Sequence, residues 1–256
     1  MKHGFVVPVY RHGETVGPLA EKLAATGLPV IIVDDGNDRQ TKEALAEWQK
    51  KIPSVVLVNL EKNTGKGGAV TKGFEKAAEL GLTHVLQIDA DGQHDSANVG
   101  FFLEESAKNP DKVICCFPVF DNKAPKSRVT GRRVSNFWAA VVTLSNELKD
   151  VLCGFRVYPL NAALKVARNP FIDRRMGFDA EILVRLYWKK VFPVFYPIKV
   201  SYPEGGVSNF RVFRDNLRIS LMFARLCIGM FLRFPMLLFQ KISRSYDKSM
   251  RLFGIV

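Results

Sequence analysis

Short apolar runs alternate with stretches of helical periodicity along the first half of the chain. Five runs rich in β-branched residues have the length and composition of strands: Gly4–Val9, Val30–Asp34, Ser54–Asn59, His84–Asp89 and Lys112–Phe117. The intervening stretches have helical periodicity: Glu14–Ala25, Thr41–Lys51, Gly68–Leu80 and Ala97–Lys108. This alternation predicts βαβ units, and hence an α/β fold with a Rossmann-like, mostly parallel central sheet flanked by helices.

The pattern loosens after Phe117. A basic loop that begins at Lys123 is followed by a predicted helix over Val134–Leu144. A further helix is predicted over Gly177–Trp188, and one or two strands over Val191–Tyr202. We expect this half to complete the sheet and to form the acceptor side of a cleft, since ligands of such sheets bind beyond the carboxyl ends of the strands.

The sequence favours one large domain, residues 1–215, because no Pro/Gly/Ser-rich linker interrupts it. A hydrophobic fraction of 47% excludes a disordered chain. The four cysteines show no metal-binding or disulfide-scaffold spacing, which favours reduced thiols in the cytoplasm. The apolar run Phe5–Val9 is too short for a signal peptide.

Residues 216–256 are predicted to form a basic, amphipathic helical tail. Its segment Asn216–Ile242 is rich in Leu, Met and Phe but is interrupted by Arg218, Arg225 and Arg233. Each arginine would be costly inside a membrane-spanning helix, whereas at about 100° per residue all three share one helix face. Because an apolar helix with one arginine stripe suits the membrane interface, we expect a protein that is peripheral on the cytoplasmic face of an anionic membrane.

Other interpretations of the tail are a buried helix with salt-bridged arginines and a helix that binds a partner protein. The net charge of +12, from 37 basic and 25 acidic residues, also raises the class of nucleic-acid-binding proteins. The tail alternates arginine with Leu, Met and Phe rather than with polar and aromatic residues, which disfavours that class. We therefore expect no nucleic-acid partner.

The strongest candidate chemistry is a pair of acids, Asp89 and Asp91, at the end of a predicted strand. Two carboxylates that flank one residue present oxygens to a single point, which suits Mg²⁺ or Mn²⁺. Gln93 would add a neutral oxygen, and either His94 or Asp95 would contact the metal ligands rather than the metal. The alternative is a solvated Asp-rich turn that caps the next helix.

Two further strand ends carry polar groups. Asp34 and Asp35 precede Gly36. One interpretation is that these acids bind a ribose or a base edge, and the alternative is an ordinary Asp-Gly turn. Residues Asn63–Ala69 form a glycine-containing turn into a helix, which would offer backbone N–H groups and Lys66 to an anion. The spacing is neither that of a Walker A loop nor that of a dinucleotide-binding fingerprint, which disfavours a kinase or a dehydrogenase.

Taken together, these motifs resemble those of family 2 glycosyltransferases, most closely the dolichyl-phosphate mannose synthase-like branch, from about Phe5 to Arg218. Each motif is weak alone, but their order and spacing are specific. The motifs are Val7–Tyr10, Asp34–Gly36, Asn63–Ala69, Asp89–His94, Cys153–Tyr158, Gly177–Leu183 and Gly205–Arg211.

The resemblance implies a GT-A fold and an inverting, metal-dependent transfer from a nucleotide-sugar donor to a lipid acceptor, a polyprenyl phosphate in this branch. It also implies two sets of donor-site residues. Contacts to the nucleotide are expected from Pro8, Tyr10, Asp35, Lys66 and Asp89, and contacts to Mg²⁺ or Mn²⁺ from Asp89, Asp91 and Gln93.

The chemical class of the acceptor determines which side chains the transfer reaction requires. A phosphate acceptor is already anionic and needs cations, for which the candidates are Arg128, Arg132, Arg133, Arg156 and Arg211, with Ser135 and Ser208 as further acceptor contacts. A hydroxyl acceptor of a lipid or glycan instead needs a base, for which Asp179 is the candidate. The candidate catalytic residues are thus Asp91, Asp179 and Arg156.

The chain also departs from the family pattern. Arg11 stands where the family usually has Asn, which leaves the role of the following Glu14 open. Asn209–Arg211 replaces a form that commonly contains Lys, so acceptor recognition is expected to differ.

Overall fold

The structure is a computed structural model of the chain. It describes residues 1–256 except 12, 92–95, 121–125, 201–210 and 253–256. Within the described residues seven strands form one sheet in the order β3-β2-β1-β4-β6-β5-β7. The strands are β1 (His3–Val9), β2 (Val30–Asp34), β3 (Val55–Asn59), β4 (His84–Gln87), β5 (Val113–Phe120), β6 (Arg156–Pro159) and β7 (Pro193–Val200).

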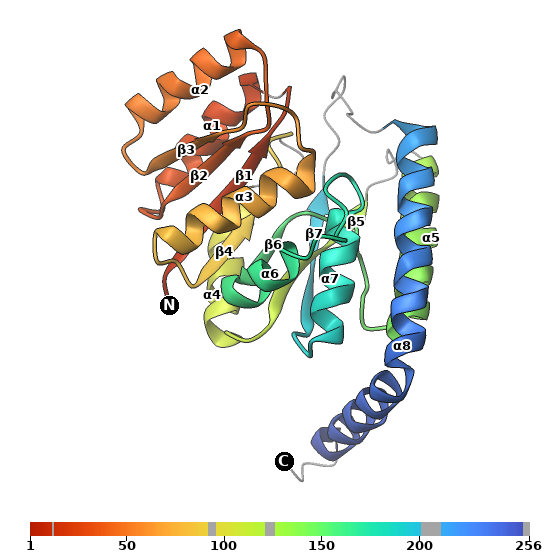
Figure 1. Cartoon of the computed structure of the whole chain (residues 1–256). Coiled ribbons are helices and arrows are strands. Elements are labelled where there is room, and N and C mark those ends of the chain that lie inside the picture. Colours follow the sequence, from red (N-terminus) through yellow and green to blue (C-terminus); the bar gives the residue numbers. More distant parts are fainter. Residues whose placement is uncertain (12, 92–95, 121–125, 201–210, 253–256) are drawn as a thin grey trace.

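Neighbouring strands run parallel except at β6, which pairs antiparallel with both β4 and β5. The helices are α1 (Gly13–Ala24), α2 (Arg39–Lys51), α3 (Lys66–Glu79), α4 (Val99–Lys108), α5 (Lys126–Thr143), α6 (Leu160–Ala167), α7 (Phe178–Trp188) and α8 (Val212–Leu252), with a 3₁₀ turn at Ser96–Asn98 (Figure 1).

Helices cover both faces of the sheet because successive strand residues point to opposite sides. On β1, Val6 packs into a core formed with α3, α5, α6, α7 and α8. Its neighbours Phe5 and Val7 pack into a second core with α1, α2 and α4. The fully buried β2 has the same alternation, with Ile31 in the first core and Ile32 in the second. These contacts confirm the predicted α/β class.

Several element boundaries differ from the predictions. Helix α5 begins at Lys126 rather than Val134, so the expected basic loop is partly helical. Strand β4 ends at Gln87, so Asp89 follows the strand instead of closing it. Within the predicted strand region Val191–Tyr202, the described residues contribute one strand, β7. Neither β6 nor α6 was predicted. Both elements are short, and β6 begins with a charged residue.

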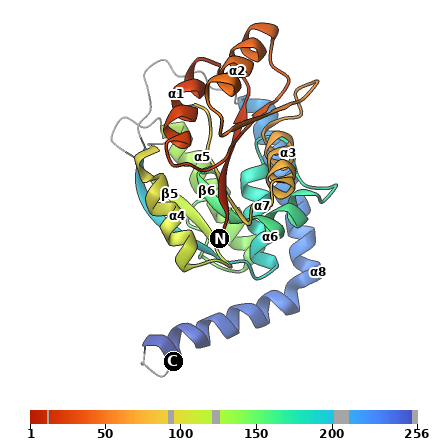
Figure 2. The same cartoon turned by 90° about the vertical axis from the view of Figure 1, so that its left-hand side faces the viewer.

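Helix α8 extends over 41 residues and contains Pro235. It runs beside α5 and α7 and then bends, so that its last turns lie below the rest of the molecule in both views (Figures 1 and 2). A proline inside a helix removes a backbone hydrogen bond and commonly causes such a kink. The helix starts at Val212, shortly before the predicted boundary between residues 1–215 and 216–256, and that division into domains stays a prediction.

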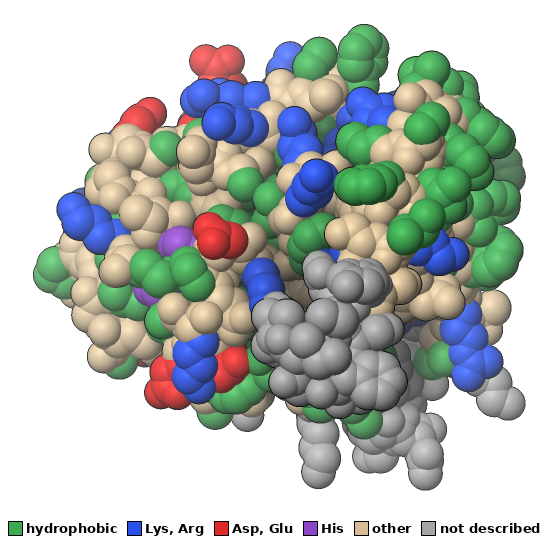
Figure 3. Space-filling model, turned by 90° about the horizontal axis from the view of Figure 1, so that it is seen from below, with side chains coloured by type: hydrophobic (Ala, Val, Ile, Leu, Met, Phe, Trp, Pro, Cys, Tyr) green, Lys and Arg blue, Asp and Glu red, His purple; other side chains and the backbone are tan. Residues whose placement is uncertain are grey.

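One side of α8 packs into the first core through Met222, Phe223, Leu226, Met230 and Leu237. The opposite side exposes large apolar side chains, among them Phe213 (85% exposed), Leu232 (79%), Phe231 (69%) and Phe239 (69%). By length and composition alone, Phe213–Ser245 is long and apolar enough to cross a membrane. Hydrophobic side chains gather along the same edge of the molecule in the space-filling view (Figure 3).

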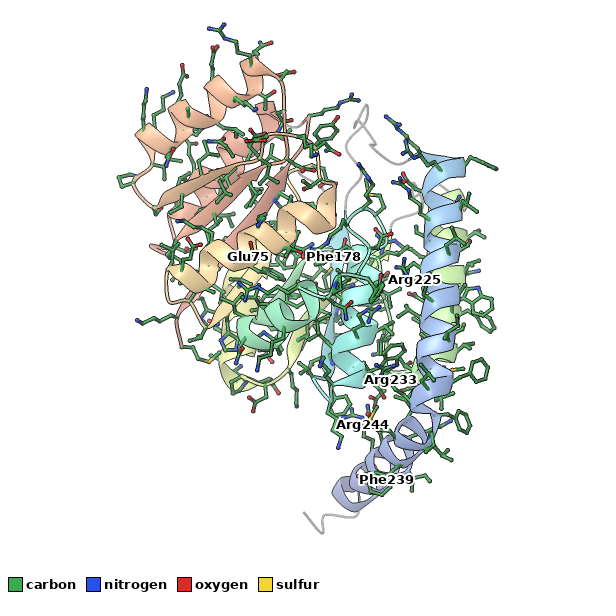
Figure 4. The ribbon with its side chains drawn as sticks, viewed as in Figure 1. Glu75, Phe178, Arg225, Arg233, Phe239 and Arg244 are labelled. Atoms are coloured by element: carbon green, nitrogen blue, oxygen red, sulfur yellow. The ribbon has the colours of Figure 1, made fainter. Side chains whose placement is uncertain are left out.

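The predicted arginine stripe is turned toward the protein. The Arg225 guanidinium lies 3.2 Å from a carboxylate oxygen of the buried Glu181 on α7. The Arg233 guanidinium lies over the Trp188 ring at 5.1 Å (Figure 4). The outer side of α8 is therefore mainly apolar. The helix is amphipathic, as one interpretation predicted, and one of its arginines forms a salt bridge with the protein, as another predicted.

A pH effect on stability is expected from His3 on β1. Its ring lies 5.4 Å from that of His84, and its Nε2 is 3.3 Å from Ser106 Oγ. Burial, His84 and the N-terminal charge all lower the pKa of His3 from its ordinary 6.5. Because the unfolded chain then binds the proton more readily, this contribution is complete above that ordinary value and is lost as the pH falls through the folded-state pKa.

We therefore expect His3→Gln to reduce the decrease in melting temperature between about pH 7 and pH 5, measured by thermal unfolding. Lys2→Gln, at an exposed neighbouring position, is the control and should leave that decrease unchanged. Equal pH dependence in the wild type and the His3 variant would contradict the prediction.

Candidate active site

The candidate site lies where the carboxyl ends of the parallel strands meet the first residues of two helices. Tyr10 follows β1, Asp35 follows β2 and Asp89 follows β4. Lys66 begins α3, and Asp179 lies in the first turn of α7. In open α/β sheets this edge is the usual place for a ligand.

Lys66 joins two of these carboxylates. Its Nζ lies 2.7 Å from Asp89 Oδ2 and 2.6 Å from Asp179 Oδ2. On the other oxygen of Asp179, Gln87 Nε2 donates a hydrogen bond of 2.9 Å. Asp179 is only 3% exposed. One ammonium group thus links residues that are far apart in the sequence.

The charges at this junction are unequally compensated. Burial raises the pKa of Asp89, and the charges of Asp179 and Asp91 raise it further, against the lowering effect of Lys66. For Asp179, burial also raises the pKa, but Lys66 and Arg156 outweigh it, so the result lies below the ordinary value. Burial lowers the pKa of Lys66, yet both carboxylates more than reverse this. Lys66 is therefore a cation, and Asp179 is a carboxylate already held by it.

The crowding of negative charge around Asp89 is what a divalent cation would relieve. Asp89 and Asp91 both follow β4, and Asp91 is half-buried. No group of three His, Cys, Asp or Glu side chains forms a metal site among the residues that the structure describes, and Gln93 lies outside them. Mg²⁺ is commonly held by one or two carboxylates together with substrate phosphates. The two acids fit a cation shared with a bound diphosphate.

Asp35 fixes the glycine-containing turn. Its carboxylate accepts hydrogen bonds from Asn63 Nδ2 (2.8 Å), Thr64 N (2.7 Å), Thr64 Oγ1 (2.8 Å) and Gly65 N (2.9 Å). Gly65 has a φ of +88°, and a Cβ there would lie 2.6 Å from the Arg174 carbonyl oxygen. The turn therefore requires glycine and places Lys66 at the start of α3. The nucleoside contact of Asp35 stays a prediction.

The other predicted nucleoside contacts, Pro8 and Tyr10, are half-buried at the end of β1. Arg11 follows with a φ of +62°. Its backbone N–H donates to Asn37 Oδ1 at 2.7 Å, and its guanidinium lies 5.1 Å from the centre of the Tyr10 ring. The unusual arginine thus borders the predicted nucleoside position.

Arg156 is fully buried. Its Nη1 donates to the Asp179 carbonyl oxygen at 2.6 Å, and its Nη2 lies 3.4 Å from the Asp150 carbonyl oxygen. These contacts hold the first turn of α7, which carries Asp179. The catalytic role of Arg156 stays a prediction, and these contacts are with backbone carbonyl oxygens.

The predicted acceptor residues are not gathered at one point. Arg132 Nη1 lies 2.8 and 2.6 Å from the two oxygens of the buried Asp150. Ser135 is buried one turn further along α5, and Arg211 is exposed just before α8. Arg133, also on α5, is exposed. The side chain of Arg128 and the whole of Ser208 lie outside the described residues.

Two residues of this site were not predicted from the sequence. Gln87 supports Asp179 from inside the sheet, and a polar residue within the apolar run His84–Asp89 was a signal of it. Gly154 lies against the ion pairs, because a Cβ there would be 2.6 Å from Lys66 Nζ and 2.8 Å from Asp89 Oδ2. Its motif was recognised, but the close approach was not.

The sequence model of the family described as Glycosyl transferase family 2 matches residues 5–170, well over half of the chain. The chain belongs to glycosyltransferase family 2. This membership agrees with the predicted family and makes the edge that carries Lys66, Asp89 and Asp179 the candidate active site of a glycosyltransferase.

Among characterised relatives, a dolichyl-phosphate beta-glucosyltransferase of Dictyostelium discoideum is 30% identical over 201 residues, 75% of this chain and 60% of the relative. Another, from Trichomonas vaginalis, is 28% identical over 231 residues, 81% and 66% of the two chains. An undecaprenyl-phosphate mannosyltransferase of Micrococcus luteus is 24% identical over 188 residues, 70% and 75%. The chain thus matches less than two thirds of the length of the two glucosyltransferases.

Solved structures show the same fold. Glucosyl-3-phosphoglycerate synthase of Mycobacterium tuberculosis, in complex with Mn²⁺, uridine diphosphate and phosphoglyceric acid, has a TM-score of 0.66 at 14% identity and covers 88% of this chain and 78% of its own. Mannosyl-3-phosphoglycerate synthase of Rubrobacter xylanophilus has a TM-score of 0.63 at 16% identity, with 100% and 76% covered. The family 2 chain therefore has the predicted GT-A fold.

Proposed function

We propose that this family 2 glycosyltransferase moves a sugar, with inversion, from a nucleotide-sugar donor to the phosphate of a polyprenyl lipid. The observation that carries the proposal is the state of Asp179, the candidate base, which Lys66 and Gln87 hold through both of its oxygens. A hydroxyl acceptor must lose a proton during attack, whereas a phosphate oxygen is already anionic. The relatives named for dolichyl and undecaprenyl phosphates support the same acceptor class.

The donor diphosphate would lie at the carboxyl edge of the sheet. Asp89 and Asp91 would hold Mg²⁺ or Mn²⁺, which supplies Lewis-acid stabilisation of the departing diphosphate. Lys66 positions Asp89 and places a fixed positive charge beside it. Because Asp35 fixes the turn before Lys66, the backbone that carries the ammonium group would already be in place before the donor binds.

Matched acceptors test this proposal directly. The full-length protein is supplied with UDP- and GDP-sugars and Mn²⁺, and offered either a polyprenyl phosphate or the corresponding polyprenol. We expect a glycosylated product from the phosphate and none from the alcohol, measured by mass spectrometry of the extracted lipid. Transfer to the polyprenol alone would contradict the phosphate acceptor and favour a base-catalysed reaction.

We also propose that the exposed apolar side of α8, with Val134, Phe137 and Trp138 of α5, docks on a membrane at its cytoplasmic face. These α5 side chains are 53%, 61% and 40% exposed. Since Arg225 and Arg233 contact the protein, apolar burial rather than charge should dominate the attachment. Binding to vesicles should then persist in high salt, which screens charges between exposed groups.

Replacement of both Phe231 and Leu232 by Ser should weaken vesicle binding by about a hundredfold or more, because burying each side chain contributes about 1.5–3 kcal/mol and about 1.4 kcal/mol corresponds to a tenfold change. Co-sedimentation with phosphatidylglycerol–phosphatidylcholine vesicles measures the effect. Phe171→Ser is the control, since that side chain is 71% exposed but lies outside α5 and α8. Unchanged binding in the α8 variant, or an equal loss in the control, would contradict this surface.

A further inference from the structure

A basic pocket lies beside the active site, between the residues that precede α7 and the first turns of α8. Its volume is about 330 Å³. Four arginines and one acid contribute to its wall, together with two apolar side chains: Arg174, Arg175, Arg218, Arg225, Asp173, Ile172 and Leu221. Of the acceptor residues predicted from the sequence, those that the structure describes do not contribute to this wall.

Neutral groups hold two of these arginines in place. Arg174 Nη1 donates to Thr71 Oγ1 at 3.0 Å and to the Ala167 carbonyl oxygen at 3.1 Å. Arg175 Nη1 donates to Asn63 Oδ1 at 2.8 Å. These hydrogen bonds fix both guanidinium groups, and neither group forms an ion pair within the described part of the chain. The charge of Arg175 does act on Asp35, where it opposes the burial that raises the pKa of that carboxyl group.

The nearby carboxylates compensate only part of the remaining charge. Arg225 lies 3.2 Å from one oxygen of Glu181, while the other oxygen of Glu181 lies 2.6 Å from Arg185. Asp173 Oδ1 accepts a hydrogen bond from the backbone N–H of Arg175. Arg218 is half-buried and makes no ion pair within the described part of the chain. Among the described residues, guanidinium groups therefore outnumber the carboxylates at this pocket.

The pocket opens beside the apolar side of α8. Leu221 belongs to its wall and is 57% exposed, and Leu217 one turn earlier is 53% exposed. Both lie on the helix side that also carries Phe231 and Ile228, because residues three or four apart share one face. A ligand with an anionic head and an apolar chain matches this pairing of arginines with exposed leucines, since guanidinium groups bind phosphate through two parallel hydrogen bonds.

We propose that this pocket binds the phosphate monoester of a membrane lipid, with the apolar chain lying against Leu217 and Leu221. The phosphate could be carried by an isoprenyl chain or by a diacylglycerol, and both have the same head-group chemistry. The pocket differs from the Lys66 junction in position and composition. The two sites are connected through the backbone, because the carbonyl oxygen of Arg174 in the pocket wall accepts a hydrogen bond from Gly68 N at 3.0 Å, at the start of α3.

Direct binding tests the proposal without any sugar donor, so its outcome is independent of whether transfer to polyprenyl phosphate occurs. The full-length protein is titrated calorimetrically with farnesyl phosphate, with dihexanoyl phosphatidic acid below its micelle concentration, and with glycerol 3-phosphate. We expect both lipids to bind more tightly than glycerol 3-phosphate, and the tighter lipid identifies the source of the phosphate.

Arg218→Gln should weaken lipid binding by about tenfold, which is typical for the loss of a hydrogen-bonded charge. The lipid affinity of Arg218→Lys should lie between those of the wild type and Arg218→Gln, because lysine keeps the charge but loses the bidentate geometry. Arg214→Gln is the matched control: it removes the same charge one turn earlier, from an exposed position outside the pocket. Melting temperatures establish that each variant is folded.

Two results would overturn the proposal. One is equal lipid affinity in the Arg218→Gln and Arg214→Gln variants, which would leave only a general effect of charge. The other is binding of glycerol 3-phosphate as tight as that of either lipid, which would exclude the apolar chain from recognition. Arg225→Gln is a poorer probe, because it also removes an ion-pair partner of the buried Glu181.

Discussion

Replacement of Lys66 by Met is expected to abolish sugar transfer and to lower the free energy of unfolding by about 3–5 kcal/mol, the usual cost of removing one partner from a buried ion pair. The Lys66 side chain is 17% exposed and lies within 2.7 Å of both Asp89 and Asp179. Without the ammonium group, two carboxylates would face each other at the edge of the sheet. Urea unfolding and the polyprenyl-phosphate transfer assay measure the two effects.

A second variant separates stability from activity. The double variant Lys66→Met/Asp179→Asn removes one negative charge together with the positive one, so it should recover much of the lost stability but none of the transfer. Lys72→Met is the control on α3, because that side chain is 54% exposed and pairs with Glu75 in an i,i+3 bridge. Such a surface pair contributes at most about 1 kcal/mol. Wild-type stability in the Lys66 variant would show that the junction does not hold the site together.

Periodicity was sufficient for the elements with long, regular patterns. Strand β2 forms over the predicted residues Val30–Asp34, where every side chain is buried. It was insufficient for β6, which has only four residues and begins with Arg156. A charged residue in so short a run gives no strand signal, and its burial depends on carbonyl oxygens contributed by Asp150 and Asp179 from elsewhere in the chain.

The site shows the same division between local motifs and distant contacts. Lys66, Asp89 and Asp179 were each singled out within a separate motif, but sequence spacing cannot reveal that one ammonium group contacts both carboxylates. Arg132 was predicted to bind an acceptor phosphate, whereas the structure pairs it with Asp150. No periodicity connects these two residues, because Arg132 lies within α5 and Asp150 lies in the segment between α5 and β6.

The α8 arginines were placed correctly on one face by helical geometry, but geometry alone does not say what that face meets. Glu181 and Trp188, both on α7, take up Arg225 and Arg233. The apolar side of the helix is left exposed as a result. Sequence patterning therefore identified the amphipathic helix, and only the packing against α7 shows which of its sides is available to a membrane.

Asp91→Asn should reduce transfer on the order of a thousandfold while the protein stays folded. A bound divalent cation contributes several kcal/mol to the stabilisation of a departing phosphate, and about 1.4 kcal/mol corresponds to a tenfold change in rate. The change keeps the size of the side chain and removes one of the charges that raise the pKa of Asp89. Asp91 is a cleaner probe than Asp89, because Asp89 also contacts Lys66.

The binding of uridine diphosphate with and without Mn²⁺, measured by calorimetry, distinguishes a lost cation from a lost fold. In the wild type Mn²⁺ should strengthen nucleotide binding, and in Asp91→Asn this gain should largely disappear while the melting temperature is retained. Asp111→Asn removes a charge at an exposed position before β5 and should behave as the wild type does. If Asp91→Asn keeps both the Mn²⁺-dependent gain in nucleotide affinity and normal turnover, the cation is not held by this pair of acids. The fixed positive charge of Lys66 would then be the remaining candidate for stabilising the donor diphosphate.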